Sequence, residues 1–561
     1  MIFSKKHTVY LYSLLFFISN SFGQISNNDV ASIDALFSSW DDSNHPGGAV
    51  LITQKGKTVF SKAYGLSNIA FQQDNTTETR FNIGSVSKQF TAMGIVLLAM
   101  QNKLSLNDPV VKYLPKFPDF GYPITIGNLL QHTSGLRDFH GLLALAGWKR
   151  SDKETNEDVF RLIERQKELN FRPGTEFLYA GTGYVLAVKI IEHITKKNFD
   201  QWMQENIFMP LGMNDTTIGL ARSNISQCAS SYYGSNKFEK AHAYWGYSGA
   251  GNMYSTTKDL NAWLQQFSTP KKEWEKAFEQ LLETATLHNG HRTNYGLGVR
   301  IDSLCGKQMV QHGGAVGGYR AIVRSFPEMQ INIVILSNFS GSNLGSKAEG
   351  ISKLLIKDSN LNKVHQRKNK YQQGDRFIKL PTKMLKQLEG VYWSNEEKIG
   401  RKIYVQHDTL RYESSREHSW PLVPLDSTLF QLIIPGSEGT TVLFDSTTKK
   451  MIVGNDQAVP GVFSYLQSHL EKRNTYLKLL VGHYYSEALQ TSYYISVIGS
   501  DVYIEHARHG KIQLTQEYDT VFSGNWPIRT LEVKIDKSGT VQGIHISNGR
   551  TRNVWFKKMN G

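Results

Sequence analysis

Ser85 and Lys88 stand three positions apart, just before a strongly apolar segment, Thr91 to Met100. Apolar residues recur there at helical spacing, which predicts a buried helix. Ser85 would lie at the helix start, where Gly84 permits a sharp entry, and Lys88 would share its face. Because burial disfavours a charged ammonium, the neutral amine could accept the proton of a nucleophilic serine. The alternative is an N-cap serine beside a surface lysine, since both residue types are common.

Two later segments carry groups that could complete this chemistry. Tyr179 follows a Pro-Gly pair at 173–174 in a predicted loop, and a phenol held near the lysine can relay a proton. The run His312–Ala315 (His-Gly-Gly-Ala) ends a predicted strand, and its glycines let a substrate backbone approach closely. The N–H groups of Ala315 and Ser85 could then form an oxyanion hole. Taken separately, each segment is also compatible with packing or a simple turn.

In this order, the segments resemble the penicillin-recognising serine hydrolases, which include class C β-lactamases, D,D-peptidases, D-aminopeptidases and related esterases. The resemblance covers about residues 30–350. Besides the Ser-x-x-Lys element, the shared motifs lie at 126–136, 173–174, 211–213, 249–260, 295–298 and 312–318. The resemblance implies that Ser85 is the acylated nucleophile and that Lys88 and Tyr179 are its general-base pair. It also implies that His312 replaces the lysine of the third motif and helps to orient the substrate or leaving group.

One position departs from the family pattern. The second motif of the family is Tyr-x-Asn, whereas this chain has glycine, Gly181, two positions after Tyr179. The asparagine normally hydrogen-bonds the lysine and the amide of an acylamino substrate, and losing a buried hydrogen bond costs on the order of 1–3 kcal/mol. We therefore expect β-lactams and acylated peptides to be poorer substrates than esters or free-amine peptides. Gly181, Gly313 and Gly314 are the expected substrate-binding glycines.

The N-terminal residues predict an export signal over residues 1–23. It has a basic start at Lys5 and Lys6, an apolar core at 9–18 and a small-x-small exit that ends at Gly23. The apolar run is shorter than the roughly 20 residues that a transmembrane helix needs. We therefore expect cleavage near Gly23 and a periplasmic or secreted protein without a transmembrane segment.

Composition argues against several other classes of partner. The formal net charge of +14 falls by two without the signal, but lysines and arginines are scattered and form no basic helix, so no nucleic-acid partner is expected. No cofactor or metal is expected either, since the His-Asn-Gly-His run at 288–291 has no further ligands near it in the sequence. Cys228 and Cys305 could form a disulfide or remain free thiols.

Strand patterns at both ends of a helical region predict the fold of residues 24–360. A hairpin precedes the nucleophile helix, helices dominate 150–270, and a helix at 342–356 closes the region. The predicted strands are 49–54, 59–64, 295–301, 310–312, 319–325 and 331–336. Pairing of the first hairpin with the last strands gives one antiparallel sheet flanked by helices, an α+β domain of the β-lactamase/transpeptidase type.

An internal repeat follows a basic linker at 361–380. Leu388–Ser394 matches Leu480–Ser486, and Asp426–Phe430 matches Tyr518–Phe522 at the same offset. Two copies of one all-β module, 381–470 and 471–561, predict two small antiparallel β-barrels. This layout resembles that of bacterial D-aminopeptidase, in which a loop of the last barrel enters the active site and recognises the substrate amine. The sequence assigns no equivalent loop here.

We therefore predict an exported serine hydrolase that acts through an acyl-enzyme on small esters or amides. D-amino-acid peptides are among the candidate substrates. One alternative is a catalytically weak or inactive protein of the same fold that binds peptide or glycan. A second alternative is a β-lactamase or D,D-carboxypeptidase. The sequence does not predict the oligomeric state.

Overall fold

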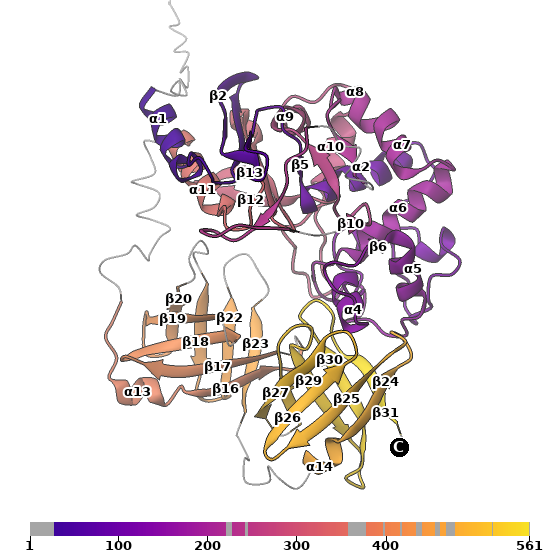
Figure 1. Ribbon diagram of the computed structural model, residues 1–561, viewed down its shortest axis with the longest axis vertical. Helices are drawn as coiled ribbons and strands as arrows, with labels where there is room; N and C mark the ends of the chain where they lie inside the picture. Colours follow the sequence, from indigo (N-terminus) through magenta and orange to yellow (C-terminus); the bar gives the residue numbers. More distant parts are fainter. Residues whose placement is uncertain are drawn as a thin grey trace, which may run out of the picture.

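The computed structural model describes most of the chain. The described residues are 27–219, 227–241, 245–356, 377–396, 399–415, 418–433, 440–454, 460–466, 477–518 and 520–559. The predicted export signal and most of the predicted linker lie outside them. Figure 1 shows a part built from helices and a sheet, with two barrels beneath it.

A six-stranded antiparallel sheet lies at the centre of the first part. Its strand order is β12-β13-β14-β15-β1-β2. The strands are β1 (Gly48–Gln54), β2 (Lys57–Tyr64), β12 (Arg300–Leu304), β13 (Lys307–Val316), β14 (Tyr319–Phe326) and β15 (Ile331–Ser337). The first hairpin pairs with the last strand from Gly48 opposite Ser337 to Gln54 opposite Ile331, as the sequence predicts.

The strand predicted at 295–301 is wrong over most of its length, because β12 begins only at Arg300. Gly298 has a φ of +78°, and a Cβ there would lie 2.8 Å from the backbone carbon of Lys88. This segment therefore packs against the nucleophile helix instead of extending the sheet.

Helices cover both faces of the sheet. On one face α11 (Leu344–Leu355) packs against β14 and β15, with α1 (Asn27–Ala35) against α11. On the other face α9 (Thr257–Gln265) contacts β1, β14 and β15. β15 is buried at every position, as expected of a strand covered on both sides. The predicted α+β fold is confirmed.

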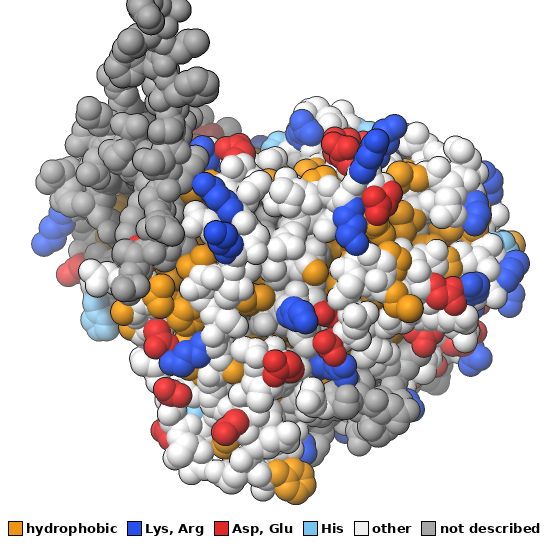
Figure 2. Space-filling view, turned by 90° about the horizontal axis from the view of Figure 1, so that it is seen from above, with side chains coloured by type: hydrophobic (Ala, Val, Ile, Leu, Met, Phe, Trp, Pro, Cys, Tyr) orange, Lys and Arg blue, Asp and Glu red, His pale blue; other side chains and the backbone are white. Residues whose placement is uncertain are grey.

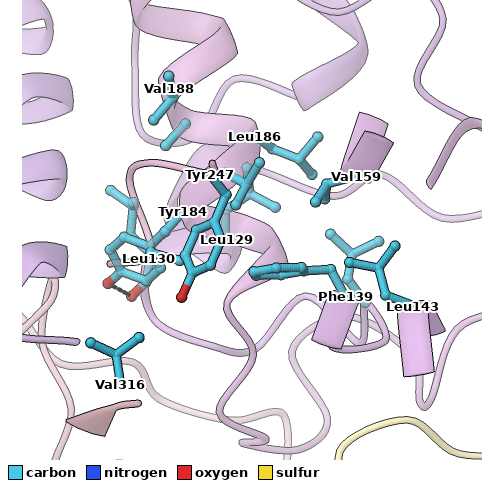
Figure 3. Packing of buried hydrophobic residues seen from close by; sticks show 14 of the residues in the cluster. Leu129, Leu130, Phe139, Leu143, Val159, Tyr184, Leu186, Val188, Tyr247 and Val316 are labelled. Atoms are coloured by element: carbon cyan, nitrogen blue, oxygen red, sulfur yellow. Dashed lines mark hydrogen bonds between the residues drawn. The ribbon is translucent and has the colours of Figure 1, made fainter. Parts of the chain in front are cut away.

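The predicted nucleophile helix is α2 (Ser87–Met100), which is buried along most of its length. It packs against α6 (Thr182–Thr195) and α10 (Glu275–Leu281). Figure 3 shows Tyr184 of α6 packed beside Leu129 and Leu130 of α3. The other helices here are α3 (Ile126–Leu130), α4 (Phe139–Leu145), α5 (Asn156–Glu164), α7 (Phe199–Met203) and α8 (Met209–Leu211).

The repeat folds into two closed barrels of the same topology. The first, which we call barrel 1, follows α13 (Thr382–Lys386) and consists of β16 (Gly390–Ser394), β17 (Ile399–Gln406), β18 (Thr409–Ser415), β19 (His418–Pro424), β20 (Leu429–Leu432), β21 (Thr441–Asp445), β22 (Lys450–Gly454) and β23 (Gly461–Leu466). The second, barrel 2, follows α14 (Leu477–Leu480) and consists of β24 (Gly482–Ser486), β25 (Thr491–Ile498), β26 (Asp501–His506), β27 (Gly510–Tyr518), β28 (Val521–Ser523), β29 (Thr530–Ile535), β30 (Val541–Ser547) and β31 (Val554–Lys558). The predicted pair of barrels is confirmed.

The surface charge, the two cysteines and the lengths of the helices do not point to a particular function. On the face seen in Figure 2, Lys and Arg side chains lie among Asp and Glu side chains, which gives this face no strong field of one sign. Cys228 and Cys305 are not joined in a disulfide bond. Within the described ranges, no helix combines the length and apolar character needed to cross a membrane.

Candidate active site

Ser85 lies in a short 3-10 turn, Gly84–Val86, that leads directly into α2. Gly84 has a φ of +51°, and a Cβ there would lie 2.7 Å from the backbone nitrogen of Ala315 in β13. A Cβ on Gly314 would lie 1.9 Å from the carbonyl oxygen of Ile83 and 3.3 Å from the Ser85 nitrogen. Only glycine permits this approach. The turn and the strand thus place the backbones of Ser85 and Ala315 side by side, where an oxyanion hole is predicted.

β13 offers an open edge next to Ser85. β12 pairs with β13 only as far as Gln311, whereas β14 pairs with it as far as Val316. Beyond Gln311, no other strand in the described part of the chain pairs with the second edge of β13. Gly313 and Ala315 are exposed there, while Gly314 is buried. Such an edge can hydrogen-bond the extended backbone of a substrate.

Lys88 lies one helical turn after Ser85 and is 2% exposed. Its Nζ donates to the Ser85 Oγ at 3.1 Å and to the Ala250 carbonyl oxygen at 2.6 Å. The rings of Tyr179 and Tyr184 lie 5.0 and 5.5 Å from the same atom. No carboxylate of the described residues pairs with this amino group. Buried lysines are almost always paired, so an unpaired one in contact with a serine indicates a functional site.

Tyr179 lies in the loop before α6, with its ring 4.2 Å from that of His132 and 6.2 Å from that of His312. Its hydroxyl is buried and has no hydrogen-bond partner among the described residues. Lys88 Nζ lies over the ring and does not bond this hydroxyl. Buried unpaired hydroxyls are rare in folded proteins. This one can form its bond with the groups that react once a substrate is present.

His312 is buried at the end of β13, and both ring nitrogens have partners. Nδ1 lies 2.7 Å from the Gly313 carbonyl oxygen, and Nε2 lies 2.9 Å from the Tyr295 hydroxyl. Since a carbonyl can only accept, Nδ1 carries the proton and Nε2 accepts from Tyr295. Burial, with a smaller effect of Lys88, lowers the pKa of His312 to about 3. His312 is therefore neutral at physiological pH, unlike the lysine that stands at this position elsewhere in the family.

Gly181 lies where the family has asparagine, and an aromatic ring fills the adjoining space. A Cβ on Gly181 would lie 2.8 Å from Cε1 of Phe139. Phe139 in turn packs edge-on against Tyr247, with ring centroids 5.0 Å apart, as Figure 3 shows. The Gly181 N–H donates to Asp138 Oδ2 at 2.6 Å. An apolar wall therefore stands where the family presents an amide side chain.

The structure adds four residues that the sequence did not single out. His132 accepts the Ala180 N–H on Nδ1 at 3.1 Å and supports the Tyr179 ring. The Arg550 guanidinium carbon lies 4.8 Å from the centroid of the same ring. The Ala250 carbonyl oxygen accepts from Lys88, and the Asp138 carboxylate accepts from the Gly181 N–H. His132 and Ala250 lie within the family motifs at 126–136 and 249–260, which could have identified them, but no local pattern marks Arg550.

The described residues around Ser85 include no group of side chains suited to binding a metal ion. Across the described ranges, no group of three or more His, Cys, Asp or Glu side chains is arranged to hold a metal ion. The residues near Ser85 instead offer a hydroxyl, an amine, a phenol and backbone N–H groups. These are the parts that acyl transfer requires.

Comparison with known proteins agrees with this geometry. Residues 33–356 match the Beta-lactamase family model. Because this match covers more than half of the chain, the protein belongs to the Beta-lactamase family. The recognition of a penicillin-related serine hydrolase fold from the sequence motifs is thus confirmed.

Among curated relatives, the D-aminopeptidase of Brucella anthropi is 28% identical over 298 residues, which are 53% of this chain and 56% of that protein. Penicillin-binding protein 4* of Bacillus subtilis is 28% identical over 335 residues, 56% of this chain and 73% of that protein. The chain therefore spans little more than half the length of the D-aminopeptidase that it matches. An octameric penicillin-binding protein homologue from Pyrococcus abyssi has a similar fold, with a TM-score of 0.53 and 24% identity over 78% of this chain and 99% of that chain.

Proposed function

We propose that the protein is a serine hydrolase that forms an acyl-enzyme on Ser85. The observation that carries the proposal is the 3.1 Å contact between the Ser85 hydroxyl and the buried Lys88, which has no described carboxylate partner. The contact lies beside the open edge of β13, where a substrate carbonyl can reach the serine. The identity to a D-aminopeptidase supports the same class of reaction.

The proposed reaction has two halves. The Ser85 Oγ attacks the substrate carbonyl carbon while Lys88, acting as a neutral amine, takes the hydroxyl proton, and the N–H groups of Ser85 and Ala315 stabilise the oxyanion. Tyr179 then gives its proton to the leaving group and is reprotonated at the expense of Lys88, and the acyl group remains on Ser85 as an ester. Water, deprotonated by the same groups, attacks that ester, releases the acid and restores the serine.

The proposed substrates are small esters or amides, with D-amino-acid peptides among them. Support comes from the D-aminopeptidase relative and from Phe139, whose ring stands beside Gly181. An aromatic wall cannot hydrogen-bond an acylamino group, so we expect weak turnover of β-lactams.

Intact-mass analysis tests the nucleophile. The full chain is incubated with a fluorophosphonate or with a penicillin, and Ser85→Ala is the control. A single phosphonate adduct that is absent from the variant is the expected result. Adducts with neither reagent would favour the alternative of a non-catalytic binding protein, and a lasting penicillin adduct would favour a penicillin-binding enzyme.

A second test concerns the asparagine position. Gly181→Asn alone should destabilise the fold, because its Cβ would lie 2.8 Å from the Phe139 ring. Adding Phe139→Ala removes that clash and should raise penicillin acylation of Ser85 above that of Phe139→Ala alone. Equal acylation of the two variants would show that the missing amide does not limit β-lactam recognition.

We further propose that residues 1–23 direct export. Support comes from the basic start, the apolar core and the small residues before Gln24. Mass determination of the mature N-terminus after expression in a Gram-negative host tests this, with a start at Gln24 expected. Retention of residues 1–23 would contradict it.

A further inference from the structure

A loop of barrel 2 reaches the catalytic residues. It joins β30 to β31 and spans residues 548–553, which are far from Ser85 in the chain. The Arg550 carbonyl oxygen accepts from the Asp138 N–H at 3.2 Å and from Asn170 Nδ2 at 2.9 Å. Thr551 Oγ1 donates to the Asp138 carbonyl oxygen at 2.8 Å. The backbone at Arg550 is therefore held from two directions by the catalytic part.

The rest of the loop is anchored as firmly. Arg137, which is 4% exposed, donates to the carbonyl oxygens of Arg552 and Asn553, both at 2.8 Å. Asn548 Nδ2 donates to the Gly141 carbonyl oxygen at 3.1 Å. A side chain on such a loop is presented in a fixed position, which lowers the entropy lost when it binds a ligand.

The Arg550 side chain itself is exposed and lies over the Tyr179 ring. Among the described residues it has no carboxylate partner. The carboxylates of the surrounding segments are engaged elsewhere: Asp138 with the N–H groups of Gly181 and His140, Glu168 with Arg137, Glu176 with Arg552, and Asp152 with Arg508. The guanidinium is thus a cation on an anchored loop that lies over the Tyr179 ring and donates to no described residue.

The positive charge of Arg550 compensates for the lack of a charged side chain at position 312 of β13. The position that carries lysine in much of the family is the neutral His312, whose two nitrogens are occupied by Gly313 and Tyr295. Lys88 is occupied by Ser85 and Ala250. The Arg550 guanidinium, unlike His312 and Lys88, donates to no acceptor among the described residues.

We propose that Arg550 selects substrates that carry a carboxylate, which its guanidinium binds while the substrate carbonyl lies at Ser85. This inference rests on the proposed function and names its substrate class. A planar guanidinium binds a carboxylate through two parallel hydrogen bonds, whereas it repels a substrate ammonium. Barrel 2 thereby supplies a specificity residue, and among the proposed esters, amides and D-peptides it favours those that present a carboxylate to Arg550 over those that present an ammonium group.

Three alkyl fluorophosphonates test the proposal. They have equal chain length and end in a carboxylate, a carboxamide or an ammonium group, and the rate of Ser85 labelling on the full chain is followed by intact mass. We expect the carboxylate probe to react roughly five- to tenfold faster than the carboxamide probe, as suits an exposed Arg–carboxylate contact. The ammonium probe should be the slowest, and salt should reduce the differences.

The variants separate charge selection from other roles of Arg550. In Arg550→Gln the ratio of carboxylate to carboxamide rates should fall to about one, and Arg550→Lys should retain part of it. Lys511→Gln, which removes an exposed charge stacked on Tyr503 in the same barrel, is the matched control and should keep the wild-type ratio. A circular dichroism melt verifies that each variant is folded.

Several outcomes would overturn the inference. One is a wild-type protein with no preference among the probes, and another is a preference that survives Arg550→Gln. If Arg550→Gln slowed all three probes equally and kept their ratio, Arg550 would act on Tyr179 and not on the substrate. Failure of every probe to label Ser85 would overturn the proposed function, and this inference with it, which is distinguishable from labelling without preference.

Discussion

The two barrels share one topology but differ in how they are attached to the catalytic part. Phe430 in barrel 1 and Phe522 in barrel 2 occupy matching positions of the repeat, and both are fully buried. The core of barrel 1 is a separate hydrophobic cluster. The core of barrel 2 belongs to the same cluster as the catalytic helices, and Figure 1 shows this barrel lying under α4.

The difference lies in contacts at one end of barrel 2. Tyr493 Oη donates to the Leu145 carbonyl oxygen at 3.1 Å, and His509 Nε2 lies 2.7 Å from the Ala144 carbonyl oxygen. Arg508 pairs with Asp152 at 2.7 Å. Strand patterning therefore makes the barrel, while side chains at one end of the barrel decide whether it becomes part of an active site.

The largest expected effect comes from emptying the two barrel cores at matched positions. Phe522→Ala and Phe430→Ala should each cost about 3–5 kcal/mol of stability in their own barrel. Because its core is continuous with α4, Phe522→Ala should also slow Ser85 labelling, whereas Phe430→Ala should not. Hydrogen exchange with mass spectrometry localises each loss. Slower labelling in Phe430→Ala would show that barrel 1 is coupled to the site as well.

The buried acid Glu154, close in sequence to Asp152 at the contact with barrel 2, should make the stability of the fold depend on pH. Burial is the main cause that raises the pKa of Glu154 to about 8, and its Oε1 lies 3.6 Å from Nδ1 of His140. The folded state therefore binds this proton more tightly than the unfolded state. The bound proton contributes fully to the stability of the folded state below pH 4.5, the pKa of this carboxyl in the unfolded chain. The contribution is lost as the pH rises through about 8.

Replacing that acid should remove the dependence. Glu154→Gln should match the wild type near pH 4.5 and exceed its stability by about 4 kcal/mol at pH 8. Urea unfolding at both pH values measures the difference. Barrel 1, with its own core, serves as the internal reference, and its exchange rates should be unchanged by the substitution. An equal pH dependence in the variant would place the cause in another group.

Much of this architecture could be predicted from residue patterns. Apolar spacing identified α2, the repeat offset identified both barrels, and the motif around Ser85 identified the family. The error at 295–301 has a local cause, because the close approach of Gly298 to α2 depends on a partner distant in the sequence.

The site was predictable only where its residues lie in motifs. Ser85, Lys88, Tyr179 and His312 are brought together as expected, although their catalytic roles stay predictions. Arg550 was not predictable, since its position depends on docking of barrel 2 on α4. Nor does a glycine at 181 reveal that the Phe139 ring occupies the adjoining space.

A moderate effect should follow from breaking the anchor of the Arg550 loop. Arg137→Met leaves the carbonyl oxygens of Arg552 and Asn553 without their donor, at a cost of about 2–3 kcal/mol. It should also reduce the carboxylate preference of Ser85 labelling, because Arg550 loses its fixed position. Arg411→Met, which removes contacts to Ser419 inside barrel 1, is the control and should leave that preference intact.

The smallest effect is expected at the rim of the same interface. Lys167 Nζ lies 3.1 Å from Glu487 of barrel 2, but the two side chains are 72% and 80% exposed. Water and salt screen such a pair, so Lys167→Ala should cost less than about 0.5 kcal/mol in urea unfolding and leave the labelling preference unchanged. A larger loss that disappears in high salt would mean that barrel 2 is held by its charged rim. Docking would then respond to ionic strength, and the buried contacts of Arg137 would not be sufficient to fix Arg550 at the site.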